Sequence, residues 1–126
     1  MAAHQHHEDI VAGLAAQLKM VLDKSPQAVY IYMDDEHKAC NKKMAELVGM
    51  ASAKEWMEAE APLADVVEAD QPAVVEAYVN ASEKMMAGHV AVRVKNARTG
   101  KTVKTDMVVV PLVFDGHVMT VHFLSK

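Results

Sequence analysis

The chain has 126 residues, of which 52% are hydrophobic and 24% charged, and its formal net charge is −4. This length and composition indicate one globular domain with its own core and exclude an intrinsically disordered protein. The acidic balance argues against direct nucleic-acid binding, and no apolar run reaches the roughly 20 residues of a membrane span. The single cysteine excludes an internal disulfide. We therefore expect a cytoplasmic protein.

The first predicted element is an amphipathic helix over residues 8–24. Its apolar side chains recur at spacings of three and four along one face: Val11, Leu14, Leu18 and Val21. Pro26 ends the helix, because proline biases the preceding residue away from the helical conformation. We divide the chain here into an N-terminal tail with a capping or dimerisation helix, residues 1–24, and a core domain, residues 25–126.

Two short strands and a short helix follow. The stretch AVYIYM is rich in β-branched and aromatic residues, and the acidic turn DDE joins it to a second strand, HKAC. Asn41 stands where this strand must become a helix, and its side chain can accept a hydrogen bond from the first helical turn. We expect Asn41 to be an N-cap whose replacement by alanine costs about 1 kcal/mol. Gly49 is expected to end the helix in the left-handed conformation.

Further helices are predicted in the middle of the chain. Ser52 and Glu55 have the spacing of a capping box, so a short helix carries Trp56. A long helix is expected to start at Asp70 as its N-cap and to close at Gly88. One side of this long helix carries mainly apolar residues: Val75, Tyr78, Val79, Ser82, Met85 and Met86.

The last third of the chain changes to the period of two that is typical of strands. In HVAVRVKN the valines alternate with residues such as Arg93 and Lys95, which predicts a half-exposed strand with its charges in solvent. TVKTDMVVVPLVF and HVMTVHFLS are expected to form a hairpin whose turn is the dipeptide Asp115–Gly116.

Alternation also assigns the side chains of the last two strands to faces of the sheet. We place Met107 and Met119 on the inner face, and His122, which differs in parity from Met119, on the outer face. Because Val108 and Val110 make the other face of the fourth strand apolar as well, the sheet needs a cover on both sides. The N-terminal helix or a second subunit is expected to supply the second cover.

Strands at both ends with helices between them predict an α+β domain with one antiparallel sheet and its helices on one face. This order of elements resembles that of the PAS domains over roughly residues 19–126. The likeness rests on LDKSPQAVYIYMDDEHKACNKKMAELVGM, on VVEADQPAVVEAY and on the three closing strands. The resemblance implies a five-stranded sheet in the order 2-1-5-4-3 with a small-molecule pocket between sheet and helices. It also implies sensing or regulated protein association, often through a dimer.

The candidate site residues follow from this arrangement. Candidates for the ligand pocket are aromatic side chains and methionines: Tyr30, Tyr32, Met44, Trp56, Tyr78, Met107 and Met119. Candidates for a homodimer interface are the apolar stripe of the N-terminal helix and one outer-face histidine: Val11, Leu14, Leu18, Val21 and His122.

The cofactor is unknown from the sequence. Haem is disfavoured because residues 71–87 contain no histidine, where haem-binding members of the family commonly carry the iron ligand. A flavin–cysteine adduct is disfavoured because the only cysteine, Cys40, precedes Asn41 and does not lie before the long helix. A small organic ligand, a dicarboxylate and an empty core all stay open.

Histidines and catalytic motifs complete the survey. His4, His6 and His7 can bind a divalent metal, but a terminal tail lacks the preorganisation of a metal site, so none is predicted. His37 and His117 are expected to be solvated at strand ends. The sequence shows no nucleophile beside a base, no phosphate-binding glycine loop and no carboxylate pair on a rigid element, so no enzymatic activity is expected.

The sequence therefore predicts a PAS-like sensory or interaction module for signal transduction or transcription regulation, as a homodimer. It would act on an effector protein in trans or within a longer parent chain, without direct contact to nucleic acid or membrane. Two alternatives stay open: a ligand-free structural dimerisation module, and a small binding or enzyme domain of another α+β fold. An internal pocket with convergent polar groups favours the first reading, and a tightly filled core favours the dimerisation module.

Overall fold

The computed structural model describes residues 2–126 and the side chains from residue 6 onward. The helices of this part of the chain are α1 (Ala2–Gln17), α2 (Lys19–Lys24), α3 (Lys42–Leu47), α4 (Ala53–Glu58) and α5 (Gln71–Lys84), with two 3₁₀ turns, η1 (Pro62–Asp65) and η2 (Glu68–Asp70). The strands are β1 (Ala28–Asp34), β2 (His37–Cys40), β3 (Gly88–Lys95), β4 (Thr102–Phe114) and β5 (His117–Ser125). None of the described helices is long and apolar enough to cross a membrane.

The strands form one antiparallel sheet in the order β2-β1-β5-β4-β3, which confirms the predicted order. The β4–β5 hairpin turns at Asp115 and Gly116, whose φ angles are 51° and 78°, as the predicted two-residue turn requires. In β3 the predicted alternation is confirmed too, because Val92 and Val94 are buried while Arg93 is exposed. The fold is therefore the predicted α+β arrangement.

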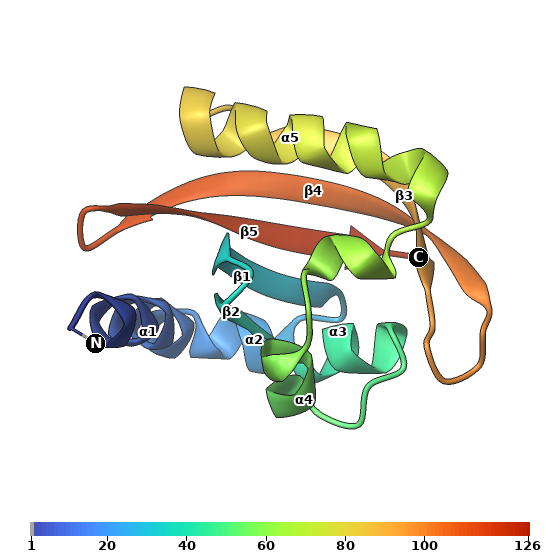
Figure 1. Cartoon of the computed structure of the whole chain (residues 1–126), viewed down its shortest axis with the longest axis horizontal. Coiled ribbons are helices and arrows are strands. Elements are labelled where there is room, and N and C mark those ends of the chain that lie inside the picture. Colours follow the sequence, from blue (N-terminus) through green and yellow to red (C-terminus); the bar gives the residue numbers. More distant parts are fainter. Residues whose placement is uncertain (1) are drawn as a thin grey trace.

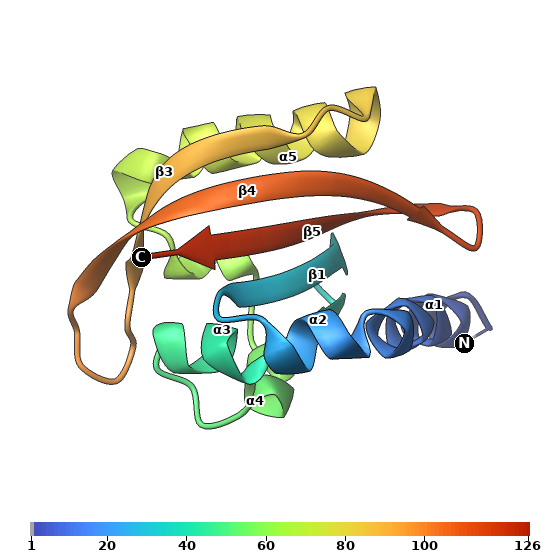
Figure 2. The same ribbon diagram turned by 180° about the vertical axis from the view of Figure 1, so that it is seen from behind.

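Helices cover both faces of this sheet (Figure 1). We call the face covered by α3, α4 and α5 the inner face, and the face covered by α1 the outer face. On the inner face, α3 and α4 lie against β1 and β2, and α5 lies along β3, β4 and β5. Seen from behind, β3 runs in front of α5, and β4 lies beside β3 (Figure 2). The predicted need for two covers is confirmed.

The N-terminal helix supplies the outer cover within the same chain. Its buried residues Ile10, Val11 and Leu14 join one hydrophobic cluster with residues of the sheet: Val29, Ile31, Ala39, Met119 and Val121. The single helix predicted for residues 8–24 is interrupted, because Leu18 leaves the helical conformation with φ −96° and ψ 15° and so separates α1 from α2.

This packing corrects part of the predicted dimer interface. Val11 and Leu14 are only 4% and 2% exposed, because the chain's own sheet covers them. Leu18 is partly buried against the same cluster. Among the predicted helix residues, Val21 on α2 stays exposed, and its neighbour Met20 is 70% exposed.

The predicted helix ends are confirmed for the two short helices and wrong for the long one. The side chains of Asn41 and Ser52 accept hydrogen bonds from the first turns of α3 and α4. Asp70 does not cap α5, because its carboxylate binds the Arg93 guanidinium at 2.9 Å instead. The helix ends before Gly88, at Met85, which adopts the left-handed conformation with φ 55°.

The inner side of α5 also differs from the predicted one. Val74, Ala77 and Ala81 are the residues that α5 buries, whereas Val75 and Met85 are exposed. Small side chains let the helix axis approach the sheet closely, so packing against β3 selected a face that hydrophobicity alone did not indicate.

Gly49 permits the sharp end of α3, as predicted. Its φ is +81°, and a Cβ atom placed on it would lie 2.7 Å from the backbone nitrogen of Arg98. We expect Gly49→Ala to lower the free energy of unfolding by about 2 kcal/mol, from left-handed strain together with this steric conflict. Urea unfolding of the wild type and Gly49→Ala measures this loss.

Gly100→Ala is the matched control. Gly100 has a similar φ of +74°, but nothing lies within 4 Å of its added Cβ. The free energy of unfolding of Gly100→Ala should therefore fall by only about 1 kcal/mol, from the backbone strain alone. Equal losses for the two variants would show that the contact with the Arg98 backbone has no energetic weight.

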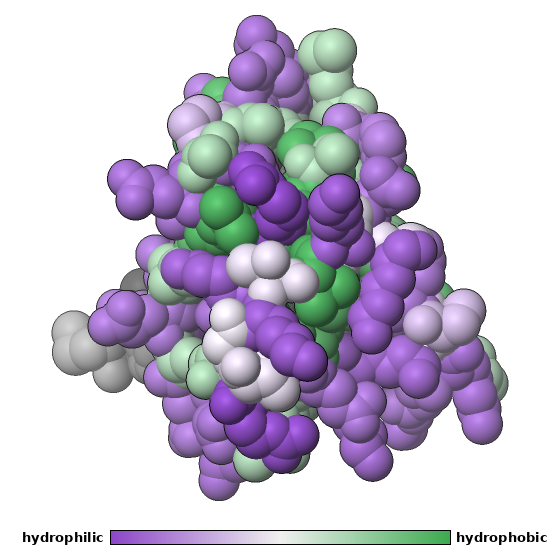
Figure 3. Space-filling view, turned by 90° about the vertical axis from the view of Figure 1, so that its right-hand side faces the viewer, coloured by the Kyte–Doolittle hydropathy of each residue, from purple (hydrophilic) through white to green (hydrophobic). Residues whose placement is uncertain are grey.

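The end of the molecule that carries the β3–β4 loop and the C-terminus is mainly hydrophilic (Figure 3). Residues of the loop, such as Arg98 and Lys101, are exposed there. The hydrophobic areas on this end are small and separated.

Candidate functional site

A pocket of about 170 Å³ lies between the inner face of the sheet and the segment from η1 to α5. Its sheet side and rim carry three tyrosines and a histidine: Tyr30, Tyr32, Tyr78 and His122. Aliphatic side chains from η1, the segment after it and α5 form the opposite wall: Leu63, Val66, Val74 and Val75. A pocket with a mostly apolar wall and a few polar groups is the usual form of a small-molecule site.

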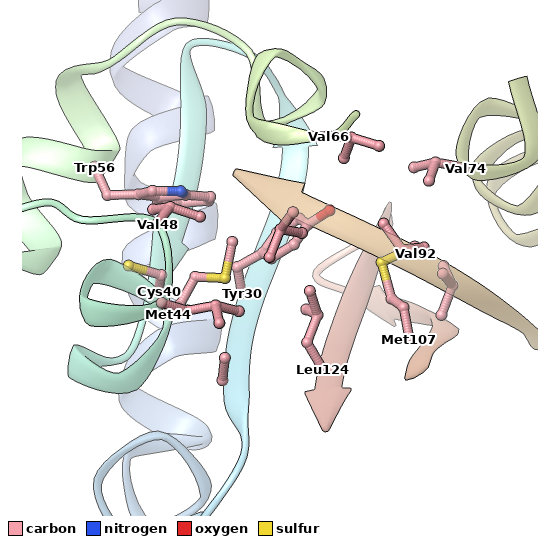
Figure 4. Packing of buried hydrophobic residues seen from close by; sticks show 14 of the residues in the cluster. Tyr30, Cys40, Met44, Val48, Trp56, Val66, Val74, Val92, Met107 and Leu124 are labelled. Atoms are coloured by element: carbon pink, nitrogen blue, oxygen red, sulfur yellow. The ribbon is translucent and has the colours of Figure 1, made fainter. Parts of the chain in front are cut away.

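Tyr30 and His122 form the floor of this pocket. They are directly paired residues of β1 and β5, so both side chains lie on the same face of the sheet. Their rings stack with centroids 4.1 Å apart and an angle of 10° between planes. Tyr30 lies between Trp56 on one side and Val66 and Val74 on the other (Figure 4), and its ring centroid is 5.3 Å from that of Trp56.

His122 is a buried polar residue with one unsatisfied atom. Its side chain is 2% exposed, and its Nε2 lies 2.8 Å from the Thr120 hydroxyl. Its Nδ1 is buried and has no hydrogen-bond partner among the described residues. Burial lowers the pKa of His122 to about 3, so the imidazole is neutral at neutral pH. Such orphaned atoms are rare and call for an explanation.

The rim of the pocket carries negative charge. The Tyr32 hydroxyl donates a hydrogen bond to the Asp35 carboxylate at 2.5 Å, and burial together with this carboxylate raises the Tyr32 pKa. Tyr32 also meets Tyr78 edge-to-face, with ring centroids 5.3 Å apart. Below the rim, burial and, second, the charge of Asp65 raise the pKa of Tyr30. Burial raises the pKa of Asp65 itself to about 6.

The positively charged side chain near the rim is that of Lys38, and its ammonium is hydrogen-bonded to backbone carbonyl oxygens. Lys38 on β2 is 3% exposed, and its ammonium donates to the carbonyl oxygens of Asp35, Met57 and Ala59 at 2.5, 3.1 and 3.0 Å. Burial lowers its pKa, although the carboxylates of Asp34 and Asp35 oppose this effect. Lys38 thus ties the end of α4 to the β1–β2 turn and is not among the residues that line the pocket.

The structure divides the seven predicted pocket residues into three groups. Tyr30, Tyr32 and Tyr78 line the pocket. The second group belongs to the same inner core but not to the pocket wall: Met44, Trp56 and Met107. Met119 was assigned to the wrong face, since it packs with α1 on the outer side.

His122 was also assigned to the wrong face. Its opposite parity to Met119 is correct, but the register pairs His122 with Val109 and Met107 with Leu124. These four side chains therefore share the inner face, where His122 forms part of the pocket. The alternation pointed to the wrong face, because the more apolar side of β5, with Met119, Val121 and Phe123, packs against α1.

Cys40 lies in the inner core beside Met44 and Trp56 (Figure 4). Burial raises the pKa of its thiol to about 12, and only weaker influences from the Ala45 backbone and Lys38 oppose this. The sulfur is therefore a protonated thiol at neutral pH, which disfavours thiolate chemistry.

The sheet order, the helices on its inner face and the pocket between them define the class: this chain has the fold of a PAS domain. No protein-family model and no curated protein sequence matches the chain. Solved structures do match the chain. One is the PAS domain of a protein from Colwellia psychrerythraea, with a TM-score of 0.70, 15% identity and coverage of 90% of this chain and 96% of that one.

Two further structures come from larger signalling proteins. A domain of a sensory box sensor histidine kinase/response regulator from Geobacter sulfurreducens matches with a TM-score of 0.61 and 12% identity, over 89% of this chain and 95% of that one. The VqmA dimer of Vibrio cholerae, described among LuxR-type receptors with a target DNA, matches with a TM-score of 0.66 and 12% identity. That match covers 87% of this chain and 50% of that one.

Proposed function

We propose that the chain is a cytoplasmic signal-sensing module that binds one small, neutral organic molecule in the pocket and transmits its occupancy to a protein partner. The observation that carries the proposal is His122, which lines an otherwise mostly apolar pocket and whose buried Nδ1 has no hydrogen-bond partner among the described residues. A ligand with one polar group would satisfy this atom. The structural likeness to a sensor kinase domain and to a receptor supports a sensory role.

The pocket limits the size of the ligand. Its volume of about 170 Å³ is close to the roughly 150 Å³ of a cavity that holds benzene. A compound with a single aromatic ring, or a short branched chain of similar size, fits this space. The ring faces and edges of the tyrosines suit a flat ligand.

The charges around the pocket limit the charge of the ligand. Two carboxylates repel an anion here: Asp35 lines the pocket, and the charge of Asp65 acts on Tyr30. The ammonium of Lys38 is held by three carbonyl oxygens, and His122 stays neutral. Dicarboxylates, which the sequence left open, are therefore disfavoured. A neutral ligand suits His122 in either tautomer, because Nδ1 is then a donor or an acceptor.

Strand β5 offers a route from the pocket to the rest of the molecule. His122 lies on its inner face, whereas the neighbouring Val121 packs on the outer face with α1. A shift of β5 on ligand binding changes the contact with α1 and α2, where Met20 and Val21 are exposed to a partner. We propose that the partner is a second copy of the chain or an effector, and that the module itself has no enzymatic activity.

A pair of equally large variants tests the pocket. Ala61 lines the pocket and directly precedes η1, so in Ala61→Phe the new ring is expected to occupy the pocket. Ala64 lies within η1 and is exposed, so in Ala64→Phe the ring is expected to enter solvent. Neutral one-ring compounds, benzamide and phenol among them, are expected to raise the melting temperature of the wild type and of Ala64→Phe by at least 2 °C near saturation. Ala61→Phe should lose this response.

Benzoate is the matched anionic probe for benzamide and should give no shift. Native mass spectrometry of protein purified from its own host would complement the melts by revealing a retained ligand. If no neutral compound stabilises the wild type and no ligand is retained, the ligand-free dimerisation module becomes the better description.

A further inference from the structure

Four histidines gather where the N-terminal helix meets two hairpins. His6 and His7 lie on α1, His37 begins β2 and His117 begins β5. The sequence placed the first two on a tail and expected the others in solvent, but His37 is 7% exposed and the fold brings all four together. The remaining tail histidine, His4, lies outside the described side chains.

Three pairs of these rings lie at distances close to those between two ligands on one metal ion, whereas the centroids of His6 and His7 are 6.0 Å apart. The ring centroids are 5.2 Å apart for His6 and His117, 5.4 Å for His7 and His117, and 5.4 Å for His7 and His37. Two imidazoles on a tetrahedral zinc ion have centroids about 5 Å apart, given Zn–N bonds of about 2.0–2.1 Å. The Nε2 atoms of His6 and His117 are 3.2 Å apart, close to the about 3.3 Å between neighbouring ligands of such a tetrahedron.

Asp34 orients the most buried of these rings. Its Oδ1 lies 2.6 Å from His37 Nδ1 and also accepts the His37 backbone N–H at 2.8 Å. A carboxylate that accepts the Nδ1 proton fixes the orientation and tautomer of the ring, and this arrangement recurs behind metal-binding histidines. One ligand atom each from His7, Asp34 and His37 lie within 4.8 Å of one another.

We propose that His7 and His37 are the histidine ligands of one divalent transition-metal ion, with Asp34 as the positioning residue of His37 and with His6 and His117 next to the site. Imidazole nitrogens select ions of the zinc, nickel and copper class over magnesium and calcium, which prefer oxygen. The ion would join the start of α1 to the β1–β2 hairpin. Metal occupancy thereby fixes the N-terminal helix on the sheet, independently of any ligand in the inner pocket.

Zinc titration of the whole chain tests the site. We expect Zn²⁺ to bind with one ion per chain and to raise the melting temperature, while Mg²⁺ at the same concentration does neither. His7→Ala removes the ring that neighbours the other three and should weaken Zn²⁺ binding at least tenfold. Asp34→Asn should weaken it 10- to 100-fold, the usual effect of losing an orienting carboxylate.

His89→Ala is the matched control, because His89 is an exposed histidine on β3 outside the cluster. It should bind Zn²⁺ like the wild type. Melting without metal shows whether each variant is folded before its affinity is compared. Equal Zn²⁺ affinity in wild type and His7→Ala, a stoichiometry other than one, or an equal response to Mg²⁺ would overturn the proposal.

Discussion

Replacing Asn41 by alanine is expected to lower the free energy of unfolding by about 3 kcal/mol, well above the about 1 kcal/mol of an ordinary cap. The sequence predicted only the cap, which is the 3.0 Å bond from the Met44 N–H. The same side-chain oxygen also accepts the Val29 N–H at 3.0 Å, and the amide nitrogen donates to the Gln27 carbonyl at 2.9 Å. Removing the side chain leaves the buried N–H of Val29 and the partly buried carbonyl of Gln27 unsatisfied.

Two further variants separate the cap from the strand contacts. Ser52→Ala removes an ordinary, exposed cap bond of 3.1 Å and should cost about 1 kcal/mol in urea unfolding. Asn41→Asp keeps the oxygen acceptor but loses the donor to Gln27, so its loss should fall between those of the two alanine variants. A loss for Asn41→Ala no greater than for Ser52→Ala would contradict the bridging role.

Acid is expected to destabilise the wild type through His122. Its folded-state pKa of about 3 lies below the ordinary value of 6.5, so between these values the unfolded chain binds a proton that the folded chain does not. The stability that His122 contributes is therefore present above pH 6.5 and is lost as the pH falls toward 3. From pH 7 to pH 4 this loss amounts to about 3 kcal/mol.

His122→Phe isolates this contribution. Phenylalanine retains the ring stacked on Tyr30 and cannot be protonated, so its stability should fall by about 3 kcal/mol less than that of the wild type from pH 7 to pH 4. Asp65 works in the opposite direction, because its raised pKa favours the folded state as the pH falls below about 6. This effect is common to both proteins and cancels in their difference.

Chemical denaturation at pH 7 and pH 4 measures that difference, and His89→Ala serves as a surface control. Parallel pH profiles for wild type and His122→Phe would show that the ring is not kept neutral by burial. A ligand that uses Nδ1 would make the acid loss larger, because it binds the neutral ring.

The local features of the fold could be predicted from the sequence. Asn41, Ser52 and the Asp115–Gly116 turn act through bonds or dihedral angles within a few residues, so their chemistry is visible in the chain itself. The order of strands and helices followed from the change of period between segments. Tyr30 and Tyr32 were found because both are aromatic and share one face of a strand.

The candidate sites depend on contacts that sequence patterns do not encode. His122 was misplaced because both faces of the sheet are covered, so either face of β5 fits the pocket side until its strand partners fix the register. Asp70 was misassigned because Arg93, 23 positions away, competes for its carboxylate. Val11 and Leu14 cover the chain's own sheet, because α1 folds back onto strands that follow it.

The sequence by itself determined the order of elements and the caps of the two short helices, because these depend on short-range periodicity and capping, and this order resembled that of the PAS domains. Only the tertiary structure decided which ring enters the pocket and which histidines meet. His37 and His117 lie far apart in the sequence, near the two ends of the core domain, and His6 and His7 precede both. Pairing of β1 with β5 and packing of α1 on the sheet bring them within a few ångströms, and these long-range contacts leave no local signal.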